Sequence, residues 1–458
     1  MYIIKQNSPT PLHIQLYNEL KKDIIDNFNI GEKLPSIRKI ASTYNLSKNT
    51  VESAYSQLYA EGYIESFPKK GYFVSDLNSD DFNINDQSKN LEIKTKPIYK
   101  YDFRAVQLPI DSFPIKLWKR LYSKAIHEKL NFGVYPNGQG ETDLRIEIAK
   151  YLNHSRGANC HPDQIVITSG FGDSMELLAK MIKNTYKDFA IEDPGYNIAR
   201  SIFENYYYNI HRIPIDQNGL ILKELEKTNS KIVYITPSHQ YPKGVTMPIS
   251  NRLKLLEWAK DVNGLIIEDD YDSELEYYNR PIPCLQGLDK YDKVVYLGTF
   301  AKAFSPALRV SYMILPNHLI PTYEKQYDTN FCKVSLDTQK TLALFMKEGY
   351  FDKHLRKIRT MNKKKHDLLK KLLKEKLGKT MKIEVQGAGL AILINPTVDF
   401  DWDKLKKLSL EKSIKLYFAK DVSGGTWDAI RLGFGGFSEL ELNEAIEAFS
   451  EVWHKCLT

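Results

Sequence analysis

One stretch of the sequence, Val294-Val-Tyr-Leu-Gly-Thr-Phe-Ala-Lys302-Ala-Phe-Ser-Pro-Ala-Leu-Arg309, decides how the chain is interpreted. A short apolar run ends in Gly298-Thr299, Lys302 follows at once, and Arg309 lies seven positions further on. A lysine amine forms Schiff bases with aldehydes, and it works best when partly desolvated at the end of a rigid strand. A hydroxyl and an arginine on either side of it could hold a phosphate. The stretch therefore predicts a buried strand that ends in a reactive lysine.

Short apolar runs of the same kind recur from about Lys100 onward, and several are followed by a helical pattern. Near-continuous runs of β-branched residues that alternate with helices predict a largely parallel sheet covered on both faces. After about Phe345, long Lys/Glu-rich helices lead into a smaller α+β region. The predicted strands are residues 165–168, 189–192, 232–236, 265–268, 294–297 and 310–314.

The first 76 residues have a different pattern, with apolar residues at helical spacing. The apolar face between Leu12 and Ile25 predicts a first helix that Gly31 ends. Ser36 and Ser47 are predicted N-caps of two further helices, because a serine hydroxyl accepts hydrogen bonds from first-turn N–H groups. Three helices in this order, the last two joined by a short turn, are typical of a helix-turn-helix motif.

A basic hairpin follows these helices. Strand-like runs at residues 63–65 and 72–74 are joined by Pro68-Lys69-Lys70-Gly71, which completes a winged helix-turn-helix pattern. In such a unit one helix enters the major groove of DNA, while basic residues elsewhere contact phosphates or the minor groove. The sequence thus predicts a double-stranded DNA operator as partner; the alternative is a solvated charged surface. The predicted DNA-binding residues are Arg38, Ser47, Lys48, Asn49, Thr50, Lys69, Lys70 and Gly71.

The composition predicts a multidomain protein of the cytoplasm. The chain has 458 residues and a net charge of +7, but residues 1–76 carry nine basic and eight acidic residues, so their charge is nearly balanced. Four scattered cysteines without a CxxC pair predict neither disulfides nor a metal site. The sequence shows neither a long apolar run nor a signal-peptide pattern, so we expect no membrane span. Residues 77–99, rich in Asp, Asn, Ser and Lys, predict a linker between domains at 1–76 and 100–458.

Chemically suggestive side chains follow several predicted strands at the point where each strand ends. In open α/β sheets, ligands bind beyond the carboxyl ends of the strands. Residues 169–173 open a helix and offer backbone N–H groups to a phosphate. Tyr196 offers a face to a planar ring, a carboxylate of Asp269-Asp270 would keep a pyridine nitrogen protonated, and the nearby phenol of Tyr271 could hydrogen-bond a ring oxygen. With the threonine and lysine of the opening stretch, they match every group of pyridoxal 5'-phosphate (PLP).

Each of these residues has an ordinary alternative. A glycine-rich turn after a strand is most often only a turn, and Tyr196 alone could be a packed aromatic residue. Asp269 and Asp270 could cap a helix or bind a metal, and Lys302 alone could be a solvated surface lysine. Their joint occurrence at successive strand ends is what favours PLP.

The chain resembles the MocR/GabR family of bacterial transcription regulators over nearly its whole length. This family fuses a GntR-type winged helix to a domain with the fold of type I PLP-dependent aminotransferases. The resemblance implies a mostly parallel, seven-stranded-type sheet, a small C-terminal α+β domain and a head-to-tail, domain-swapped homodimer. In the N-terminal part it rests on Leu34-Pro-Ser-Ile-Arg-Lys-Ile-Ala41, Leu46-Ser-Lys-Asn-Thr-Val51 and Leu58-Tyr-Ala-Glu-Gly-Tyr63. In the larger part it rests on Glu192-Asp-Pro-Gly-Tyr196, Thr236-Pro-Ser-His-Gln-Tyr-Pro-Lys-Gly244, Ile267-Glu-Asp-Asp-Tyr-Asp-Ser-Glu274 and Gly298-Thr-Phe-Ala-Lys302.

The resemblance also implies roles around the ring of the cofactor. Lys302 would form the Schiff base with PLP, and Tyr196 would stack on the ring. Asp269 would pair with the ring nitrogen and Tyr271 with the ring oxygen.

Further roles implied by the resemblance concern the phosphate and the effector. Thr299, Arg309 and the Gly170–Phe171 backbone would hold the phosphate, and Tyr135 would be lent to the site of the partner subunit. Arg431 would bind the carboxylate of an amino acid through a bidentate fork.

Three positions depart from the aminotransferase pattern. Tyr241 stands where an asparagine usually supports the ring oxygen. Phe171 and Gly172 occupy a phosphate turn that often carries hydroxyl and amide side chains, and Ala301 replaces a common serine. These departures leave PLP binding in place but weaken the case for transamination.

Three functions are compatible with the sequence. The favoured one is a PLP-dependent regulator in which an amine, an amino acid or PLP itself changes DNA binding. The second is an active aminotransferase with an accessory DNA-binding domain. The third is a regulator that kept the fold and lost the cofactor.

Overall fold

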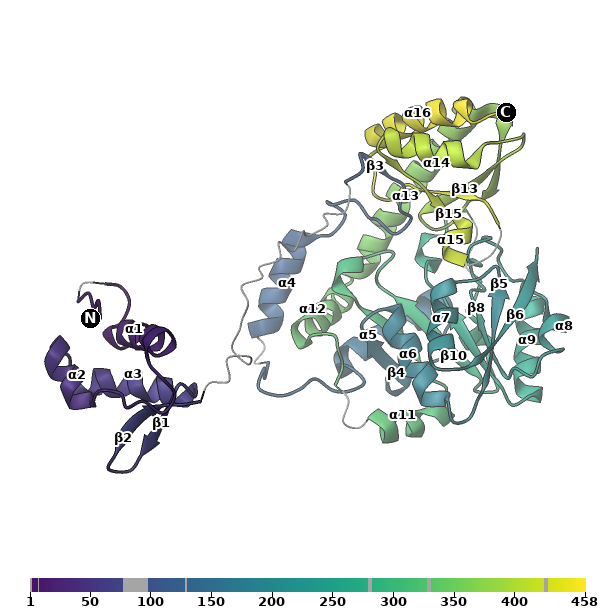
Figure 1. Ribbon diagram of the computed structural model, residues 1–458. Helices are drawn as coiled ribbons and strands as arrows, with labels where there is room; N and C mark the ends of the chain where they lie inside the picture. Colours follow the sequence, from purple (N-terminus) through teal and green to yellow (C-terminus); the bar gives the residue numbers. More distant parts are fainter. Residues whose placement is uncertain are drawn as a thin grey trace. The chain divides into compact units, whose positions relative to one another are not determined.

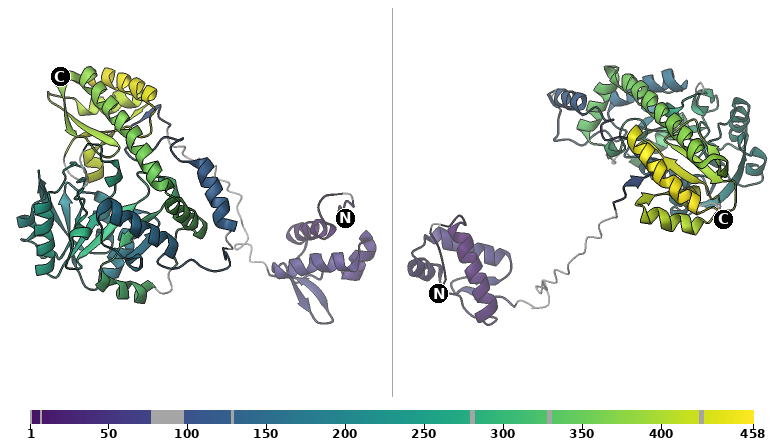
Figure 2. Two further views of the ribbon diagram at one scale, coloured as in Figure 1. Left: turned by 180° about the vertical axis from the view of Figure 1, so that it is seen from behind. Right: turned by 90° about the horizontal axis from the view of Figure 1, so that it is seen from above.

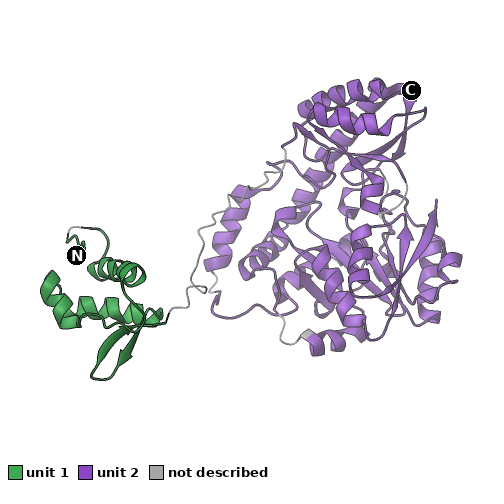
Figure 3. Ribbon diagram, viewed as in Figure 1, with its two compact units in different colours: residues 1–96 green, residues 97–458 purple. Residues whose placement is uncertain are grey.

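A computed structural model of the chain divides into two compact units, Met1–Lys96 and Pro97–Thr458 (Figure 3). Most of the predicted linker, residues 77–97, lies outside the described residues, so the domain boundaries stay predictions. The structure describes residues 2–6, 8–76, 98–127, 130–278, 282–327, 331–423 and 427–458.

The first unit contains three helices and a hairpin (Figure 1). Ser36 and Ser47 cap the second and third helices as predicted, because each hydroxyl accepts a hydrogen bond from the N–H three residues later. Asn45, in the left-handed conformation with φ of 50°, follows the second helix and makes the turn. The elements are α1 (Leu12–Asn27), α2 (Ile37–Tyr44), α3 (Lys48–Ala60), β1 (Ile64–Phe67) and β2 (Gly71–Val74).

Helix α1 ends at Asn27, before the predicted stop at Gly31. The chain leaves the helix because the next residues pair with β2. The N–H of Gly31 donates to the carbonyl of Val74, and the N–H of Leu34 donates to the carbonyl of Tyr72, both at 2.9 Å. These backbone hydrogen bonds place residues 31–34 beside β2 as a third extended segment of the wing. A longer α1 would lose them.

The second unit is built around a mostly parallel sheet of eight strands in the order β4-β11-β10-β9-β8-β5-β6-β7. β11 runs antiparallel to both neighbours, and β7 is a two-residue antiparallel return of β6. Seven strands thus match the expected sheet, and β7 is an addition. The strands are β4 (Ile165–Thr168), β5 (Asp188–Asp193), β6 (Asn209–Asp216), β7 (Gly219–Leu220), β8 (Ile232–Ile235), β9 (Leu265–Asp269), β10 (Val294–Thr299) and β11 (Ser311–Ile314).

Helices cover both faces of this sheet (Figures 1 and 2). Successive residues of β10 show why, since Tyr296 packs with residues of α5 and α12, whereas Val295 and Leu297 pack with residues of α6 and α7. The helices of this part are α4 (Ile115–His127), α5 (Thr142–Arg156), α6 (Phe171–Ile182), α7 (Asn197–Asn205), α8 (Leu222–Leu225), α9 (Ile249–Asp261), α10 (Leu285–Leu288), α11 (Ile320–Tyr327) and α12 (Leu336–Lys347).

The small C-terminal region follows the 28-residue helix α13 (Tyr350–Leu377). Its antiparallel sheet has the order β12-β13-β16-β15, and β14 pairs separately with β3. Phe103, next to β3, shares a core with residues of α16, so the first and last segments of this unit pack together. The elements are β3 (Tyr101–Asp102), β12 (Met381–Val385), β13 (Ala391–Pro396), α14 (Trp402–Glu411), β14 (Ile414–Lys415), β15 (Tyr417–Phe418), α15 (Ala419–Ser423), β16 (Ile430–Gly433) and α16 (Glu439–Lys455).

In the ranges that the structure describes, no helix combines the length and the apolar character needed to cross a membrane.

Candidate functional site

Lys302 lies just beyond the carboxyl end of β10, as the opening stretch predicts. It lines a cavity of about 40 Å³ together with His239, Tyr271 and Arg431. Burial and, after it, the positive charge of Arg431 lower the pKa of Lys302 to about 8. Near physiological pH, a larger fraction of this amine is therefore neutral than in a solvated lysine. The neutral amine is the form that attacks an aldehyde.

The two adjacent carboxylates after β9 have separate environments. Asp270 forms a buried ion pair with Arg156 at 2.6 Å and accepts a hydrogen bond from Tyr296 at 2.7 Å. Asp269 instead accepts a hydrogen bond from the phenol of Tyr234 at 2.5 Å, and burial raises its pKa to about 7. A protonated pyridine nitrogen beside Asp269 would offset the cost of burying that carboxylate. Asp269 therefore fits the predicted role, and Asp270 belongs to the structural ion pair.

Four aromatic rings, those of Phe171, Tyr196, Tyr241 and Tyr271, pack against one another in sequence. The ring of Tyr196 lies edge-on to Phe171 and to Tyr241, with centroid distances of 5.2 and 5.1 Å. Tyr241 in turn lies edge-on to Tyr271 at 5.9 Å. The tyrosine that departs from the aminotransferase pattern is thus packed between the two tyrosines predicted to contact the ring of PLP.

The predicted phosphate site lies at the start of α6. Gly170 precedes the helix with φ of +94°, and a Cβ atom there would lie 1.9 Å from Nη2 of Arg309. The glycine thus permits Arg309 to approach the turn, where its Nη2 donates to the carbonyl of Ser169 at 3.4 Å. The hydroxyl of Thr299 accepts hydrogen bonds from the N–H of Ala301 and from the hydroxyl of Ser311. A helix N-terminus beside a guanidinium suits a phosphate dianion.

Arg431 reaches the Lys302 cavity from β16 of the C-terminal region. Its guanidinium lies 5.0 Å from the ring centroid of Tyr241. Its Nε is buried and makes no hydrogen bond among the described residues. A buried donor that lacks an acceptor fits the predicted binding of a carboxylate.

Tyr135 lies away from these contacts. Its side chain is 74% exposed and stacks on Phe331 at a centroid distance of 4.0 Å. Its assignment to the site of a partner subunit stays a prediction.

Two residues without a predicted role also line the Lys302 cavity, His239 and Asp272. Nδ1 of His239 lies 2.8 Å from a carboxylate oxygen of Asp272. Both belong to motifs that carried the family resemblance, so the motifs marked them. Their mutual contact depends on two loops meeting in space, which no local pattern reveals.

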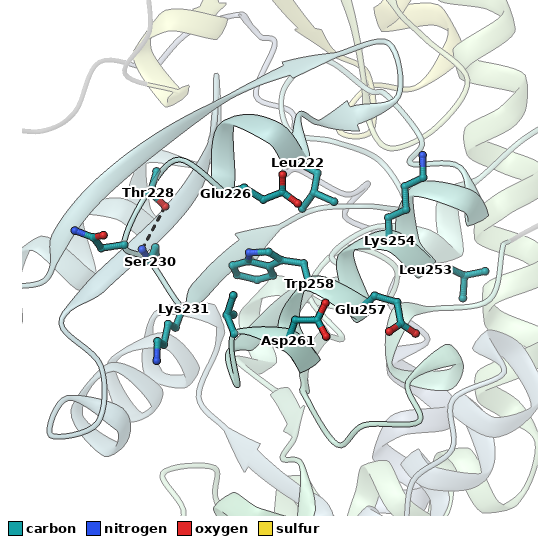
Figure 4. A pocket seen from close by; sticks show the side chains of 12 residues that line it. Leu222, Glu226, Thr228, Ser230, Lys231, Leu253, Lys254, Glu257, Trp258 and Asp261 are labelled. Carbon is teal, nitrogen blue, oxygen red and sulfur yellow. Dashed lines mark hydrogen bonds between the residues drawn. The ribbon is translucent and has the colours of Figure 1, made fainter.

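A larger cavity, of about 850 Å³, lies between α8 and α9 (Figure 4). Its lining includes Trp258, Glu257 and Lys231. Lys231 precedes β8, so this cavity lies toward the amino end of that strand. It contains none of the predicted site residues. Size alone therefore does not mark the functional site.

The predicted DNA-contacting side chains are accessible. Ser47, Lys48 and Asn49 are exposed at the start of α3, and Thr50 is half-buried there. The Ser47 hydroxyl accepts a hydrogen bond from the N–H of Thr50 at 3.1 Å. Arg38 on α2 and Lys69 and Lys70 in the wing are exposed, and Gly71 is half-buried with φ of +107°.

Comparisons with known proteins agree with this division. The family of bacterial regulatory proteins called gntR matches residues 12–74, and the family aminotransferase class I and II matches residues 107–423. The uncharacterized HTH-type transcriptional regulator YdeL of Bacillus subtilis is 34% identical over 451 residues, which is 97% of each chain. The probable rhizopine catabolism regulatory protein MocR of Rhizobium meliloti is 30% identical and covers 86% of this chain and 83% of its own.

Solved structures resemble the second unit. The multiple substrate aminotransferase from Thermococcus profundus superposes with a TM-score of 0.69 at 23% identity, over 83% of this chain and 99% of its own. PLP is the cofactor of this domain. The chain belongs to the MocR/GabR family of HTH-type transcriptional regulators, in which a GntR-type DNA-binding domain is fused to a class I and II aminotransferase domain.

Proposed function

We propose that occupancy of the Lys302 site by PLP and by an amine-bearing effector changes the affinity of the winged helix for its operator. The main support is that three features meet at one site. Lys302 has a lowered pKa, the buried Nε of Arg431 lacks an acceptor among the described residues, and the carboxylate of Asp269 is buried. That chemistry lies in a chain whose other domain binds DNA.

PLP, when bound, supplies an aldehyde that condenses reversibly with primary amines. The chain supplies the rest. Lys302 provides the resident amine, Asp269 keeps a proton on the ring nitrogen, and Tyr196 stacks on the ring. Arg309 and Thr299, with the Gly170–Phe171 backbone, bind the phosphate.

Two kinds of signal fit this site. An amine or amino acid would compete with the amine of Lys302. If the effector is an amino acid, Arg431 would bind its carboxylate in a bidentate manner. Alternatively, PLP itself is the signal, and the protein reports whether the vitamin is present. In both cases the ligand must bind the DNA-competent and DNA-incompetent states with different affinity.

Operator retention in the presence of each ligand tests the proposal. The probe is an operator fragment selected from genomic DNA by its binding to the protein, and it is tested with cofactor-free protein, with protein and PLP, and with protein, PLP and a panel of amino acids. We expect operator affinity to change with PLP or with one class of amine, and Lys302→Ala to remove the amine response. Equal retention in every state would refute the proposal.

Active transamination is the second candidate, because the structural relatives are aminotransferases. A half-reaction separates the two: a fast shift of the PLP absorbance to that of the pyridoxamine form with common amino acids would favour an enzyme. Slow conversion would fit Tyr241 in place of the usual asparagine. If the wild-type protein shows no PLP absorbance and Lys302→Ala looks the same, this member of the family has lost the cofactor.

We further propose a cytoplasmic homodimer, head to tail, in which Tyr135 completes the partner's phosphate site. Its support is the exposed Tyr135–Phe331 stack, which leaves the phenol available to a second copy. Sedimentation of the PLP-loaded protein as a monomer would contradict the dimer.

A further inference from the structure

His239 and Asp272 form a polar pair on the wall of the Lys302 cavity. Nδ1 of the imidazole lies 2.8 Å from Oδ2 of Asp272, whose side chain is 5% exposed. The loop above the pair is close: a Cβ atom at Gly389 would lie 2.7 Å from the same carboxylate oxygen. The pair is thus enclosed, and none of the roles proposed above uses it.

The pair contacts the hydroxyl of Tyr271. That hydroxyl donates to the backbone carbonyl of His239 at 3.1 Å and lies 3.3 Å from its Nδ1. Because the Asp272 carboxylate is an acceptor only, it fixes a proton on Nδ1. The Nδ1–H group then faces both the carboxylate and the phenol oxygen of Tyr271.

The charges around His239 also shift its pKa. Burial alone would lower the pKa of His239, but Asp272 and, more weakly, Glu276 raise it, and Arg431 opposes them. The net result is a pKa above the ordinary value for histidine. The 2.8 Å contact with the Asp272 carboxylate, rather than this pKa, makes Nδ1 the donor.

We propose that the His239–Asp272 pair positions Tyr271, so that the phenol turns its hydrogen from the His239 carbonyl to the ring oxygen when PLP binds. Donation from Nδ1–H to the phenol oxygen strengthens the phenol's own O–H as a donor, since linked hydrogen bonds polarise one another. The inference rests on the proposed PLP site. In this proposal the His239–Asp272 pair positions the phenol of Tyr271. Tyr241 does not have that role, because its ring lies edge-on to the ring of Tyr271.

The pH dependence of the absorbance of the PLP-loaded protein tests the inference. Donation to the ring oxygen stabilises its negative charge and weakens its hold on the neighbouring proton at the nitrogen bound to C4'. We expect His239→Ala to raise the midpoint pH of the spectral change by about one unit. Asp272→Asn should shift it in the same direction by less, and His239→Asn should restore part of the effect through its amide N–H.

His211 provides a matched control, since it forms a pair with Asp188 at the same distance of 2.8 Å across β5 and β6. His211→Ala should leave the midpoint unchanged. In a Tyr271→Phe background, His239→Ala should have little further effect, because the phenol through which it acts is gone.

The outcomes separate the inference from the function on which it rests. A wild-type protein without PLP absorbance would refute the PLP site itself. A wild-type spectrum with a midpoint that neither His239→Ala nor Asp272→Asn moves would overturn only the positioning role. Equal shifts with and without the Tyr271 hydroxyl would also overturn it, because His239 would then act by another route. If His239→Ala does not fold, Asp272→Asn and His239→Asn decide the question alone.

Discussion

At the residue scale, burial and partners separate side chains that look alike in the sequence. Asp269 and Asp270 are neighbours, yet Arg156 neutralises one and a neutral phenol contacts the other. The pKa of Asp270 is lowered, since Arg156 and its hydrogen bonds outweigh burial, whereas burial raises the pKa of Asp269 to about 7. The unpaired member is the one suited to a cationic ligand atom.

Asp269→Asn should stabilise the cofactor-free protein, and more so at pH 8 than at pH 5. The folded-state pKa of about 7 lies above the ordinary 3.8, so the folded form holds the proton more tightly and stability falls as pH rises between these values. An amide has no such cost, and the pH-dependent gain should be on the order of 2 kcal/mol. Urea unfolding at the two pH values measures it.

Asp270→Asn is the matched comparison. It leaves Arg156 buried without its ionic partner and should destabilise the protein at both pH values, by about 3–5 kcal/mol. A pH dependence of stability that Asp269→Asn leaves unchanged would contradict the assignment of the raised pKa to Asp269.

Gly170→Ala should weaken PLP binding. The added Cβ would displace the guanidinium of Arg309 from the turn, and the residue would be strained at φ of +94°. We expect at least a tenfold loss of PLP affinity, about 1.4 kcal/mol, measured by fluorescence titration. Gly172→Ala is the control, because a Cβ there meets nothing within 4 Å. If both variants bind PLP like the wild type, the phosphate does not sit at this turn.

At the scale of elements, sequence patterns identify the strands and caps that rest on local chemistry. The six continuous apolar runs all became strands, and Ser36 and Ser47 became caps. β6 was missed because most of its side chains are exposed or half-buried, which breaks up the apolar run. The predicted end of α1 at Gly31 was wrong. Residues 31–34 pair with β2, and this tertiary contact overrides the local signal of Gly31.

The candidate site follows the same rule. Residues at the strand ends could be predicted, because parallel strands bring their carboxyl ends to one edge of the sheet. The contact of Arg431 with Tyr241 and that of His239 with Asp272 depend on how separate segments meet. The roles of individual site residues stay predictions until they are measured.

Ser47 allows the stability and the DNA contact of α3 to be tested separately. Ser47→Ala removes the hydroxyl that caps the helix and should cost about 1 kcal/mol of stability. Ser47→Asp keeps a capping oxygen but places a negative charge where we predict DNA phosphates and bases. We expect near-normal unfolding and at least a tenfold loss of operator affinity in a gel-shift assay.

Ser36→Ala is the control for the cap, since Ser36 caps α2 but is not among the predicted DNA contacts. It should lower stability as Ser47→Ala does and spare operator binding under folding conditions. Operator binding by Ser47→Asp that equals the wild type would remove the start of α3 from the DNA interface.

At the scale of the whole molecule, a shared site predicts complementation between two defective subunits. Tyr135→Ala and Lys302→Ala should each impair the PLP site of its own homodimer. A mixed dimer contains one complete site, because the Lys302→Ala subunit donates Tyr135 to the subunit that keeps its lysine. Random equimolar mixing after partial denaturation makes about half of the dimers mixed, so we expect PLP absorbance to return to about a quarter of the wild-type sites. No recovery in dimers that are shown to be mixed would contradict the shared site.

The central claim is an energetic coupling between the Lys302 site and the operator. Coupling between two binding sites is reciprocal, so a ligand that changes operator affinity must itself bind with an affinity changed by the same factor when operator is present. The direct measurement is a titration of PLP, and then of the active amine, with and without saturating operator DNA. We predict that the ligand's Kd changes on the order of 5–150-fold, equal to the change in operator Kd, and that Lys302→Ala abolishes the amine coupling. Ligand affinities that are identical with and without operator would contradict the account.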